Sequence, residues 1–332
     1  MLAARASMQH RRGKSMTTRP CAALRPVDVV VVNWNAGSQL RVCLDSIDRY
    51  GGAEVARTIV VDNGSVDGSE EAADDRSGVT LVRTGANFGF GRACNVGARL
   101  ATAQYLLFLN PDAALFADTA KQALSFMRDP ASADVGICGV QLLDESGRVT
   151  RTCARFPSAW GLFAHAIGVD RLVPRLGHVM AEWDHGQTRQ VDHVIGAFFL
   201  VRREVFDALH GFDERFFVYL EDLDFSYRAR QAGWRSVYLA EARAFHAGGG
   251  TSKQVKAMRL FYSLRSRLLY VLKHFSTPGA LLVMMATLFI EPWSRVIGAM
   301  AERSWVALIQ TWEAYRLLWR WLARWAITGE TR

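Results

Sequence analysis

The sequence of 332 residues contains few cysteines and no Cys-x-x-Cys motif. The five cysteines, an odd number, are Cys21, Cys43, Cys94, Cys138 and Cys153. The sequence therefore indicates neither a disulfide framework nor a cysteine-based zinc site. We expect the protein to work in a reducing compartment.

Long apolar segments are also missing. The apolar run at residues 279–290 has twelve residues and is followed by Glu291 and Pro292, so it is too short to cross a bilayer. The first 26 residues hold six basic residues, no acidic residue and no apolar run typical of a secretory signal. We therefore expect no transmembrane helix, and we expect residues 1–26 to be a disordered or spurious extension.

Acidic residues are scarce at both ends of the chain, although the net charge is +8. Residues 253–332 contain twelve basic and four acidic residues, whereas residues 27–252 carry 22 basic and 28 acidic residues. An acidic body with basic ends is unlike a nucleic-acid-binding domain, whose positive charge lies on its folded face. A basic tail next to an anionic membrane is the better interpretation.

What the sequence does have is a repeated pattern of apolar strand, polar turn and helix. This alternation predicts an α/β fold with a mostly parallel sheet flanked by helices. The predicted strands are residues 27–32, 55–61, 80–83 and 105–109, and helices are predicted through 40–47, up to 103 and over 115–127.

The second half of the chain shows a weaker alternation. Residues 147–190 have the composition of an irregular insertion, and strands are predicted over 191–201 and 235–239. Apolar residues then recur at steps of three and four over 257–272, which predicts an amphipathic helix.

Polar side chains occur where the predicted strands end, namely Asn33, Asp62, Asn87 and Asp112. Ligands bind at this edge of open α/β sheets. A dinucleotide fingerprint at Gly89-Phe90-Gly91 fails, because Cys94 stands where the pattern requires Gly or Ala. We therefore expect no nicotinamide or flavin.

An acidic cluster, Glu221-Asp222-x-Asp224, follows an aromatic segment. If Glu221 opens a helix, Asp224 and Arg228 lie four residues apart and can pair. Asp222 is then left to face a cleft, or to serve as a helix-capping acid.

In combination, these motifs make the chain resemble the family-two glycosyltransferases of the GT-A fold, over residues 27–252. The Asn-Pro-Asp sequence at 110–112 resembles the rhamnosyltransferase branch of that family. The motifs are VVVVNWN at 29–35, VDNGSVDGS at 61–69, NFGFG at 87–91 with Asn95, LNPD at 109–112, GAFFLVRR at 196–203, GFDE at 211–214, EDLD at 221–224, and His246.

The resemblance implies roles for individual residues. Asp222 matches the catalytic base, Asp112 and His246 match ligands of Mg²⁺ or Mn²⁺, and Gly196 and Glu221 match the acceptor side. Asn110 departs from the Asp-x-Asp pattern of the family. The donor-binding residues that the resemblance implies are Asn33, Asn35, Asp62, Asn87, Gly89, Arg92 and Asn110.

The expected function is an inverting, metal-dependent transfer of a sugar, L-rhamnose from dTDP-L-rhamnose, to a glycan or a polyprenyl-diphosphate-linked acceptor. Two alternatives stay open: another donor, such as a UDP-hexose or UDP-galactofuranose, and a nucleotide-sugar-binding protein without catalysis. We expect a cytoplasmic protein at the inner face of the cell membrane that binds no nucleic acid.

The tail of residues 253–332 is rich in tryptophan. Trp305, Trp312 and Trp319 repeat every seven residues among arginines, a combination typical of the headgroup layer of a membrane. The alternative is a helix that packs on the catalytic domain or on a second copy of the chain, as in a homodimer.

Overall fold

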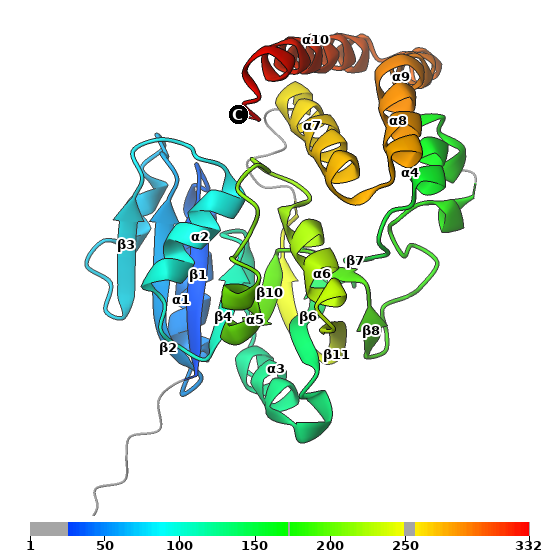
Figure 1. Ribbon diagram of the computed structural model, residues 1–332. Coiled ribbons are helices and arrows are strands. Elements are labelled where there is room, and N and C mark those ends of the chain that lie inside the picture. The colour runs from blue at the N-terminus through cyan, green and yellow to red at the C-terminus, as the bar shows by residue number, and fades with distance from the viewer. Residues whose placement is uncertain (1–25, 172, 249–255, 332) are drawn as a thin grey trace, which may run out of the picture.

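The computed structural model describes residues 26–171, 173–248 and 256–331. Within them the chain forms a nine-stranded mixed sheet flanked by helices, followed by a helical region at the C-terminus (Figure 1). The predicted fold class is confirmed. The expectation for residues 1–26 lies, apart from its last residue, outside the described residues.

The first half of the chain forms the parallel part of the sheet. The strands lie in the order β3-β2-β1-β4, and their side chains in β1 and β4 are buried throughout, as expected for a sheet covered on both faces. The elements are β1 (Val27–Asn33), α1 (Ser38–Tyr50), β2 (Val55–Asp62), β3 (Val79–Arg83), α2 (Phe90–Leu100) and β4 (Tyr105–Leu109).

In the second half, β10 runs antiparallel between β4 and β6, and β11 pairs in parallel with β6. The insertion predicted at 147–190 contains the short elements β7 and α4, and β8 begins at its end. The elements are β5 (Ala113–Leu115), α3 (Thr119–Arg128), β6 (Val135–Leu143), β7 (Cys153–Ala154), α4 (Ala159–Ala166), β8 (Arg189–Val191), β9 (His193–Val194), β10 (Phe198–Arg202), α5 (Arg203–Ala208), α6 (Glu221–Gln231) and β11 (Arg235–His246).

Two predicted helix boundaries were wrong. α3 begins at Thr119 rather than at residue 115, because residues 113–115 pair with the end of β11. α2 ends at Leu100 rather than at residue 103, because the backbone N–H groups of Thr102 and Ala103 donate to Asp28 Oδ2 at 2.6 and 2.9 Å. Both differences arise from partners distant in sequence.

Two predicted strand boundaries were also wrong. Residues 191–201 do not form one strand, because β8 pairs with β11, β9 pairs with β7, and β10 joins the central sheet. β11 runs on to His246 rather than ending at residue 239, because its last residues pair with β5 and β6.

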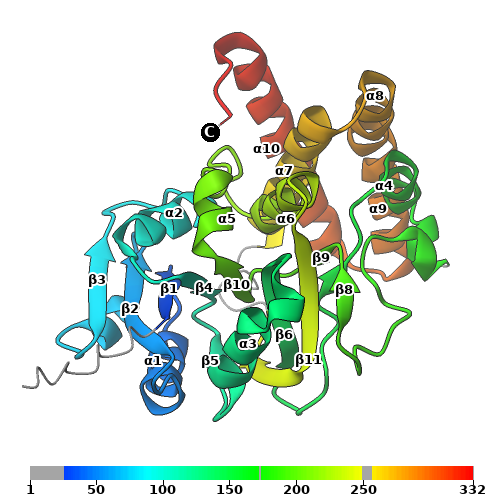
Figure 2. The ribbon, with the colours of Figure 1, turned by 60° about the horizontal axis from the view of Figure 1, so that its bottom comes forward.

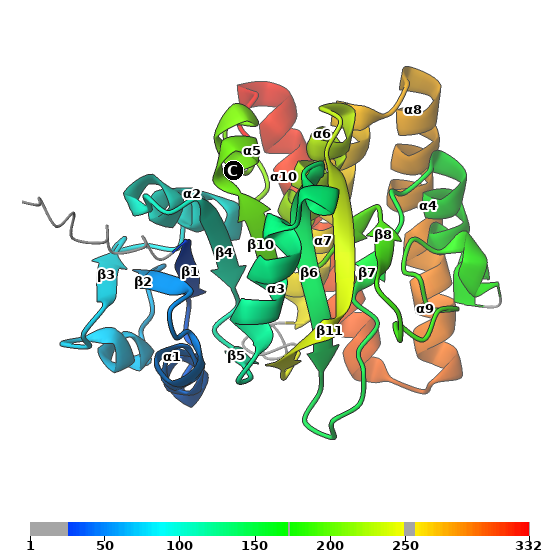
Figure 3. The ribbon, with the colours of Figure 1, turned by 90° about the horizontal axis from the view of Figure 1, so that it is seen from below.

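Helices cover both faces of the sheet (Figures 2 and 3). The apolar faces of α1 and α3 pack in one buried cluster with the sheet, whereas α2, α5 and α6 contribute to the cluster on the other face. The loops at the carboxyl ends of the strands are left to build a site.

The C-terminal region consists of α7 (Lys256–His274), α8 (Thr277–Met285), a π-helical turn (Ala286–Ile290), α9 (Glu291–Ala301) and α10 (Trp305–Thr328). The amphipathic helix predicted at 257–272 is confirmed as α7. α7 lies beside α10 (Figure 1). Its buried face packs against α10 and the segment around α6, in a cluster that includes Phe216, Leu223, Leu268 and Leu318.

The apolar run at 279–290, expected to be too short to cross a bilayer, lies within a longer helix. α8, the π turn and α9 form one helix of 25 residues, Thr277–Ala301, which by length and composition alone could span a bilayer. The helix continues past Glu291 because Arg267 and Arg295 pair with that carboxylate. The π turn ends at Ile290, two residues before Pro292, whose missing N–H would disturb a regular helix.

Candidate functional site

The ends of β1 and β2 are joined by a buried polar network. Asn33 and Asp62 are opposite each other in the parallel register, and Asn33 Nδ2 lies 3.0 Å from Asp62 Oδ1. The same amide nitrogen also lies within 3.0 Å of the hydroxyl groups of Ser65 and Ser69. Asn35, in the left-handed backbone region, accepts a 2.8 Å hydrogen bond from the backbone N–H of Val66. These predicted donor residues therefore hold the two loops in shape.

The loop after β3 is attached to the loop after β2 through Asn63, a residue that the sequence analysis did not select. Asn63 Nδ2 donates to Asn87 Oδ1 at 2.9 Å, and Asn63 Oδ1 accepts from the backbone N–H of Phe88 at 2.9 Å. Gly89 has a φ of +87°, and a Cβ there would collide with the carbonyl oxygen of Phe217. A glycine is thus required where this loop meets the segment before α6.

Arg92, predicted to meet a phosphate, is engaged with protein groups in this structure. Its Nε lies 3.6 Å from Glu214 Oε2, and its guanidinium carbon lies 4.6 Å from the centre of the Phe88 ring. Asn95 of the same helix donates to the carbonyl oxygen of Phe212 at 2.8 Å. These contacts fix α2 to the segment that leads into α6.

The structure brings Asp112 and His246 together, although they are 134 positions apart in the sequence. His246 Nε2 lies 3.3 Å from Asp112 Oδ1, and the two side chains are only 12% and 9% exposed. The antiparallel pairing of His246 with Ala113 creates this contact. Among the described residues no three His, Cys, Asp or Glu side chains form a metal-sized group, so a cation here would need ligands from a bound molecule.

Asp222 is held at the beginning of α6 with its side chain 18% exposed. Its Oδ2 accepts a 2.8 Å hydrogen bond from the backbone N–H of Gly196, and its Oδ1 accepts one from its own neighbour Leu223. The two residues before α6, Tyr219 and Leu220, both have positive φ, a strained conformation that clusters at functional sites. The local backbone therefore aims this carboxylate.

His193 lies directly beside Asp222. The sequence analysis did not select His193, because no motif spacing links it to Asp222. His193 Nε2 is 3.6 Å from Asp222 Oδ2, and its Nδ1 is 3.0 Å from the hydroxyl oxygen of Ser226. Burial lowers the pKa of His193, and the charge of Asp222 opposes this only in part. A neutral imidazole therefore supports the carboxylate.

Glu221, expected on the acceptor side, is buried and lies against Gly91 of α2. Its Oε2 has no hydrogen-bond partner within the described part of the chain. Burial, and next the charge of Asp222, raises the pKa of Glu221 well above its ordinary value. Burial and the neighbouring charge thus favour the protonated form of Glu221.

A short path connects Asp222 to the Asn110–Asp112 turn. The backbone N–H of Asn110 donates to the carbonyl oxygen of Ala197 at 3.0 Å, and the adjacent Gly196 holds Asp222. The carboxyl ends of β1, β2 and β4 meet along the same edge, since these strands are parallel. The predicted site residues are therefore gathered around one edge of the sheet.

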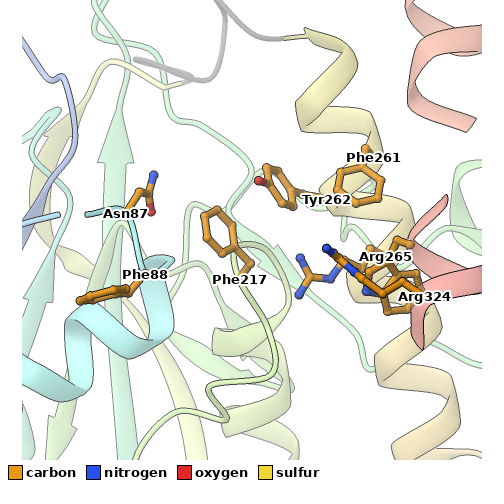
Figure 4. Close-up of a pocket in the computed structure, with 8 residues that line it drawn as sticks. Asn87, Phe88, Phe217, Phe261, Tyr262, Arg265 and Arg324 are labelled. Carbon is orange, nitrogen blue, oxygen red and sulfur yellow. The ribbon is translucent and has the colours of Figure 1, made fainter. Parts of the chain in front are cut away.

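A pocket of about 270 Å³ lies between the loop after β3 and the C-terminal helices (Figure 4). The ring of Phe217 stacks on that of Tyr262, with 4.7 Å between the ring centres. Asp112, Asp222 and His246 do not line this pocket. The residues that line it are Asn87, Phe88, Phe217, Phe261, Tyr262, Arg265, Trp321 and Arg324.

The chain is similar in sequence to known proteins. The chain is 32% identical to the N-acetylglucosaminyl-diphospho-decaprenol L-rhamnosyltransferase of Mycobacterium tuberculosis over 235 residues, which are 66% of this chain and 75% of that protein. It is 26% identical to the rhamnosyltransferase WbbL of Escherichia coli over 201 residues, 57% of this chain and 72% of that one.

A solved structure shares the fold. The mannosyltransferase PcManGT from Pyrobaculum calidifontis, in complex with GDP-Man and Mn²⁺, superposes with a TM-score of 0.52 at 20% identity, covering 95% of this chain and 79% of that one. Residues 28–209, more than half of the chain, match the family model of glycosyl transferase family 2. The chain belongs to this family, and its fold is the GT-A fold that the sequence predicted.

Proposed function

We propose that the protein is an inverting transferase that moves L-rhamnose from dTDP-L-rhamnose to a cell-surface glycan or a lipid-linked glycan precursor. The names of the relatives support the sugar, and one of them acts on a decaprenol-diphosphate-linked substrate. The observation that carries the proposal is Asp222, a partly exposed carboxylate fixed by the Gly196 N–H at the edge where the site residues gather.

Asp222 is the general base in this mechanism. It removes the proton from the acceptor hydroxyl while that oxygen attacks the anomeric carbon of the donor. The bond between that carbon and the diphosphate breaks on the opposite face, so the configuration inverts. One carboxylate is sufficient for this reaction, because no covalent intermediate forms. A carboxylate has about four acceptor positions, so the two backbone hydrogen bonds leave capacity for the acceptor proton.

The donor occupies the loops after β1, β2 and β3 in this proposal. Asn33, Asp62 and Asn87 shape the loops, as their mutual contacts support, while Asn35 and Gly89 lie where the nucleotide approaches the backbone. To bind a phosphate, Arg92 must first break its ion pair with Glu214. The free energy needed to break this pair is small, because the Arg92 side chain is 40% exposed. Asn110 stands at the end of β4 beside the donor.

Asp112 and His246 would hold Mg²⁺ or Mn²⁺. The 3.3 Å between a carboxylate oxygen and an imidazole nitrogen fits two ligands of a common cation, and the remaining ligands would be diphosphate oxygens. When bound, the cation would supply positive charge to the departing diphosphate. Asn110 supplies no carboxylate, so Asp112 and His246 would be the ligands that the protein contributes.

The acceptor approaches from the side of Gly196 and Glu221. Glu221 is buried, and burial raises its pKa well above the ordinary value, whereas Asp222 is partly exposed and is the acid that the acceptor can reach. A polyprenyl-diphosphate-linked acceptor would place the enzyme in the cytoplasm, as a peripheral protein at the inner face of the cell membrane. The basic C-terminal region supports that location.

A panel of nucleotide sugars tests the donor. A ligand at about 100 times its Kd stabilises a protein by ~2.7 kcal/mol, and a weaker ligand at the same concentration stabilises it less. We therefore expect dTDP-L-rhamnose, as the true donor, to raise the melting temperature most. We also expect dTDP release to accelerate with a lipid-diphosphate acceptor. Preferential stabilisation by a UDP-hexose or UDP-galactofuranose would contradict the rhamnose donor. Donor binding without any turnover would support a binding protein instead of an enzyme.

A further inference from the structure

The helix formed by α8 and α9 carries a row of exposed apolar side chains. Leu281, Met285, Phe289, Trp293 and Ile297 recur every four residues and are between 51% and 69% exposed. The opposite side of the helix is buried against the protein, at residues such as Val283, Ala286 and Thr287. The exposed apolar side chains of this row therefore do not belong to the hydrophobic core of the chain.

A second exposed row lies on α10. Trp305, Ile309 and Trp312 are 78%, 65% and 76% exposed, whereas the opposite side of the helix packs on α7. The rings of Phe289 and Trp319 lie 5.8 Å apart between their centres and join the two rows. We call this surface the outer apolar face, and its members are Leu281, Met285, Phe289, Trp293, Ile297, Met300, Trp305, Ile309, Trp312 and Trp319.

The helices that carry the outer apolar face, α8, α9 and α10, lie at the edge of the molecule, away from the sheet (Figure 1). Two rows of exposed apolar side chains that meet at Phe289 and Trp319 are typical of an interaction site. Arg316 and Arg320 are exposed on α10 in the same stretch as its tryptophans. Tryptophan beside arginine suits the headgroup layer of a membrane, and the net positive charge of residues 253–332 complements anionic lipid.

Polar contacts attach the α8–α9 helix to the rest of the protein along its length. The hydroxyl group of Ser294 donates to the carbonyl oxygen of Ala166 in α4 at 2.7 Å, and the hydroxyl group of Tyr315 donates to the carbonyl oxygen of Thr287 at 3.0 Å. Arg267 of α7 pairs with Glu291, and both side chains are less than 10% exposed. A helix that crossed the bilayer would have to break these contacts and bury unpaired charges.

We infer that the outer apolar face inserts into the headgroup layer of an anionic bilayer, with the α8–α9 helix and α10 lying in the plane of the membrane. This surface would make the membrane contact that the proposed function requires, and the inference rests on that function. The catalytic domain then stands on the membrane beside its lipid-linked acceptor.

Sedimentation of the full chain with vesicles tests the inference. The vesicles contain phosphatidylcholine with phosphatidylglycerol, or phosphatidylcholine alone. We expect the triple variant Phe289→Gln, Trp293→Gln and Ile297→Gln to bind the anionic vesicles at least about tenfold more weakly than the wild type. The matched control, Val42→Gln with Leu100→Gln, removes similarly exposed apolar groups from α1 and α2 and should bind like the wild type.

A charge variant separates the electrostatic contribution. Arg316→Gln with Arg320→Gln should weaken binding to the anionic vesicles by about tenfold or more, because each basic residue near such a surface contributes ~1 kcal/mol. The same pair should have little effect on binding to phosphatidylcholine alone. An equal loss on both kinds of vesicle would contradict the charge argument.

Three results would overturn the inference. The first is failure of the folded wild type to sediment with anionic vesicles at low salt. The second is light scattering that shows a lipid-free dimer which the triple variant converts to a monomer, since a second copy would then cover the face. The third is protection of the C-terminus inside the vesicles from added protease, which would mean that the helix crosses the bilayer.

Sugar transfer to a soluble acceptor analogue is measured in parallel. Transfer without vesicle binding contradicts the membrane inference alone. Vesicle binding without transfer contradicts the proposed function alone.

Discussion

At the scale of single residues, the position of Asp222 leads to the most direct prediction. Asp222→Asn should lower turnover at least about a hundredfold, because the amide cannot accept the proton of the acceptor, while donor affinity stays nearly the same. Steady-state kinetics and donor titration check this. Asp207→Asn, which removes an acid on α5 paired with Arg203 at the surface, is the control and should stay active. Unchanged turnover in the Asp222 variant would end the assignment.

His193 is expected to position Asp222 rather than to touch substrate. His193→Gln should reduce kcat by about tenfold and leave the KM for the donor unchanged, because the imidazole contacts Asp222 Oδ2 and Ser226. Added to Asp222→Asn, it should cause little further loss, since residues that act together are not additive. A fully additive double variant would show that His193 acts elsewhere.

The pair of Asp112 and His246 is predicted to serve one cation. Alanine at either position should weaken binding of a nucleoside diphosphate in the presence of Mg²⁺ by about tenfold or more, and should matter little in EDTA. Isothermal titration with and without chelator measures both. If EDTA leaves wild-type transfer unchanged, the metal assignment fails for both residues.

At the scale of elements, Asp224 connects α6 to α7. Its buried carboxylate lies 2.8 Å from Arg228, 2.6 Å from Lys273 and 2.7 Å from His274. Burial alone would raise its pKa, but the hydrogen bond from His274, the charge of Arg228 and the contacts of Lys273 lower the pKa below its ordinary value of 3.8. The predicted ion pair with Arg228 is confirmed, and the two partners from α7 were not foreseen.

Asp224→Asn should lower the free energy of unfolding at neutral pH by about 3 kcal/mol, because it removes the fully buried carboxylate that pairs with the half-buried Arg228 and Lys273. The folded pKa is depressed, so this contribution is complete above the unfolded value of 3.8 and is lost as the pH falls below it. Denaturant titrations at several pH values should show the gap between wild type and variant closing in acid. A gap that widens on acidification would contradict the linkage.

At the scale of the whole molecule, the C-terminal helices complete the hydrophobic core around α7. Leu318 of α10 is fully buried in a cluster with Phe261, Leu264 and Leu268. Leu318→Ala should therefore lower the free energy of unfolding by about 2 to 5 kcal/mol, measured by denaturant titration. Trp312→Ala on the same helix is the control and should have little effect, because Trp312 is 76% exposed. Equal effects of the two would contradict this packing.

The sequence determined the features that depend on neighbouring residues. Apolar runs predicted β1, β2 and β4 within a residue or two, and the three- and four-residue steps predicted α7. Polar side chains at the strand ends indicated the edge of the sheet where the candidate site residues gather. These predictions succeed because side-chain periodicity and turn chemistry act within a few residues of the chain.

Only the tertiary structure decided which distant residues meet. The pairing of β11 with β5 brings His246 to Asp112, and the division of residues 189–202 among three pairings brings His193 and Gly196 to Asp222. Likewise, the continuous helix through Glu291 depends on Arg267 from another element. The sequence could not specify these contacts, because strand register and the burial of charge are set by packing across the whole molecule.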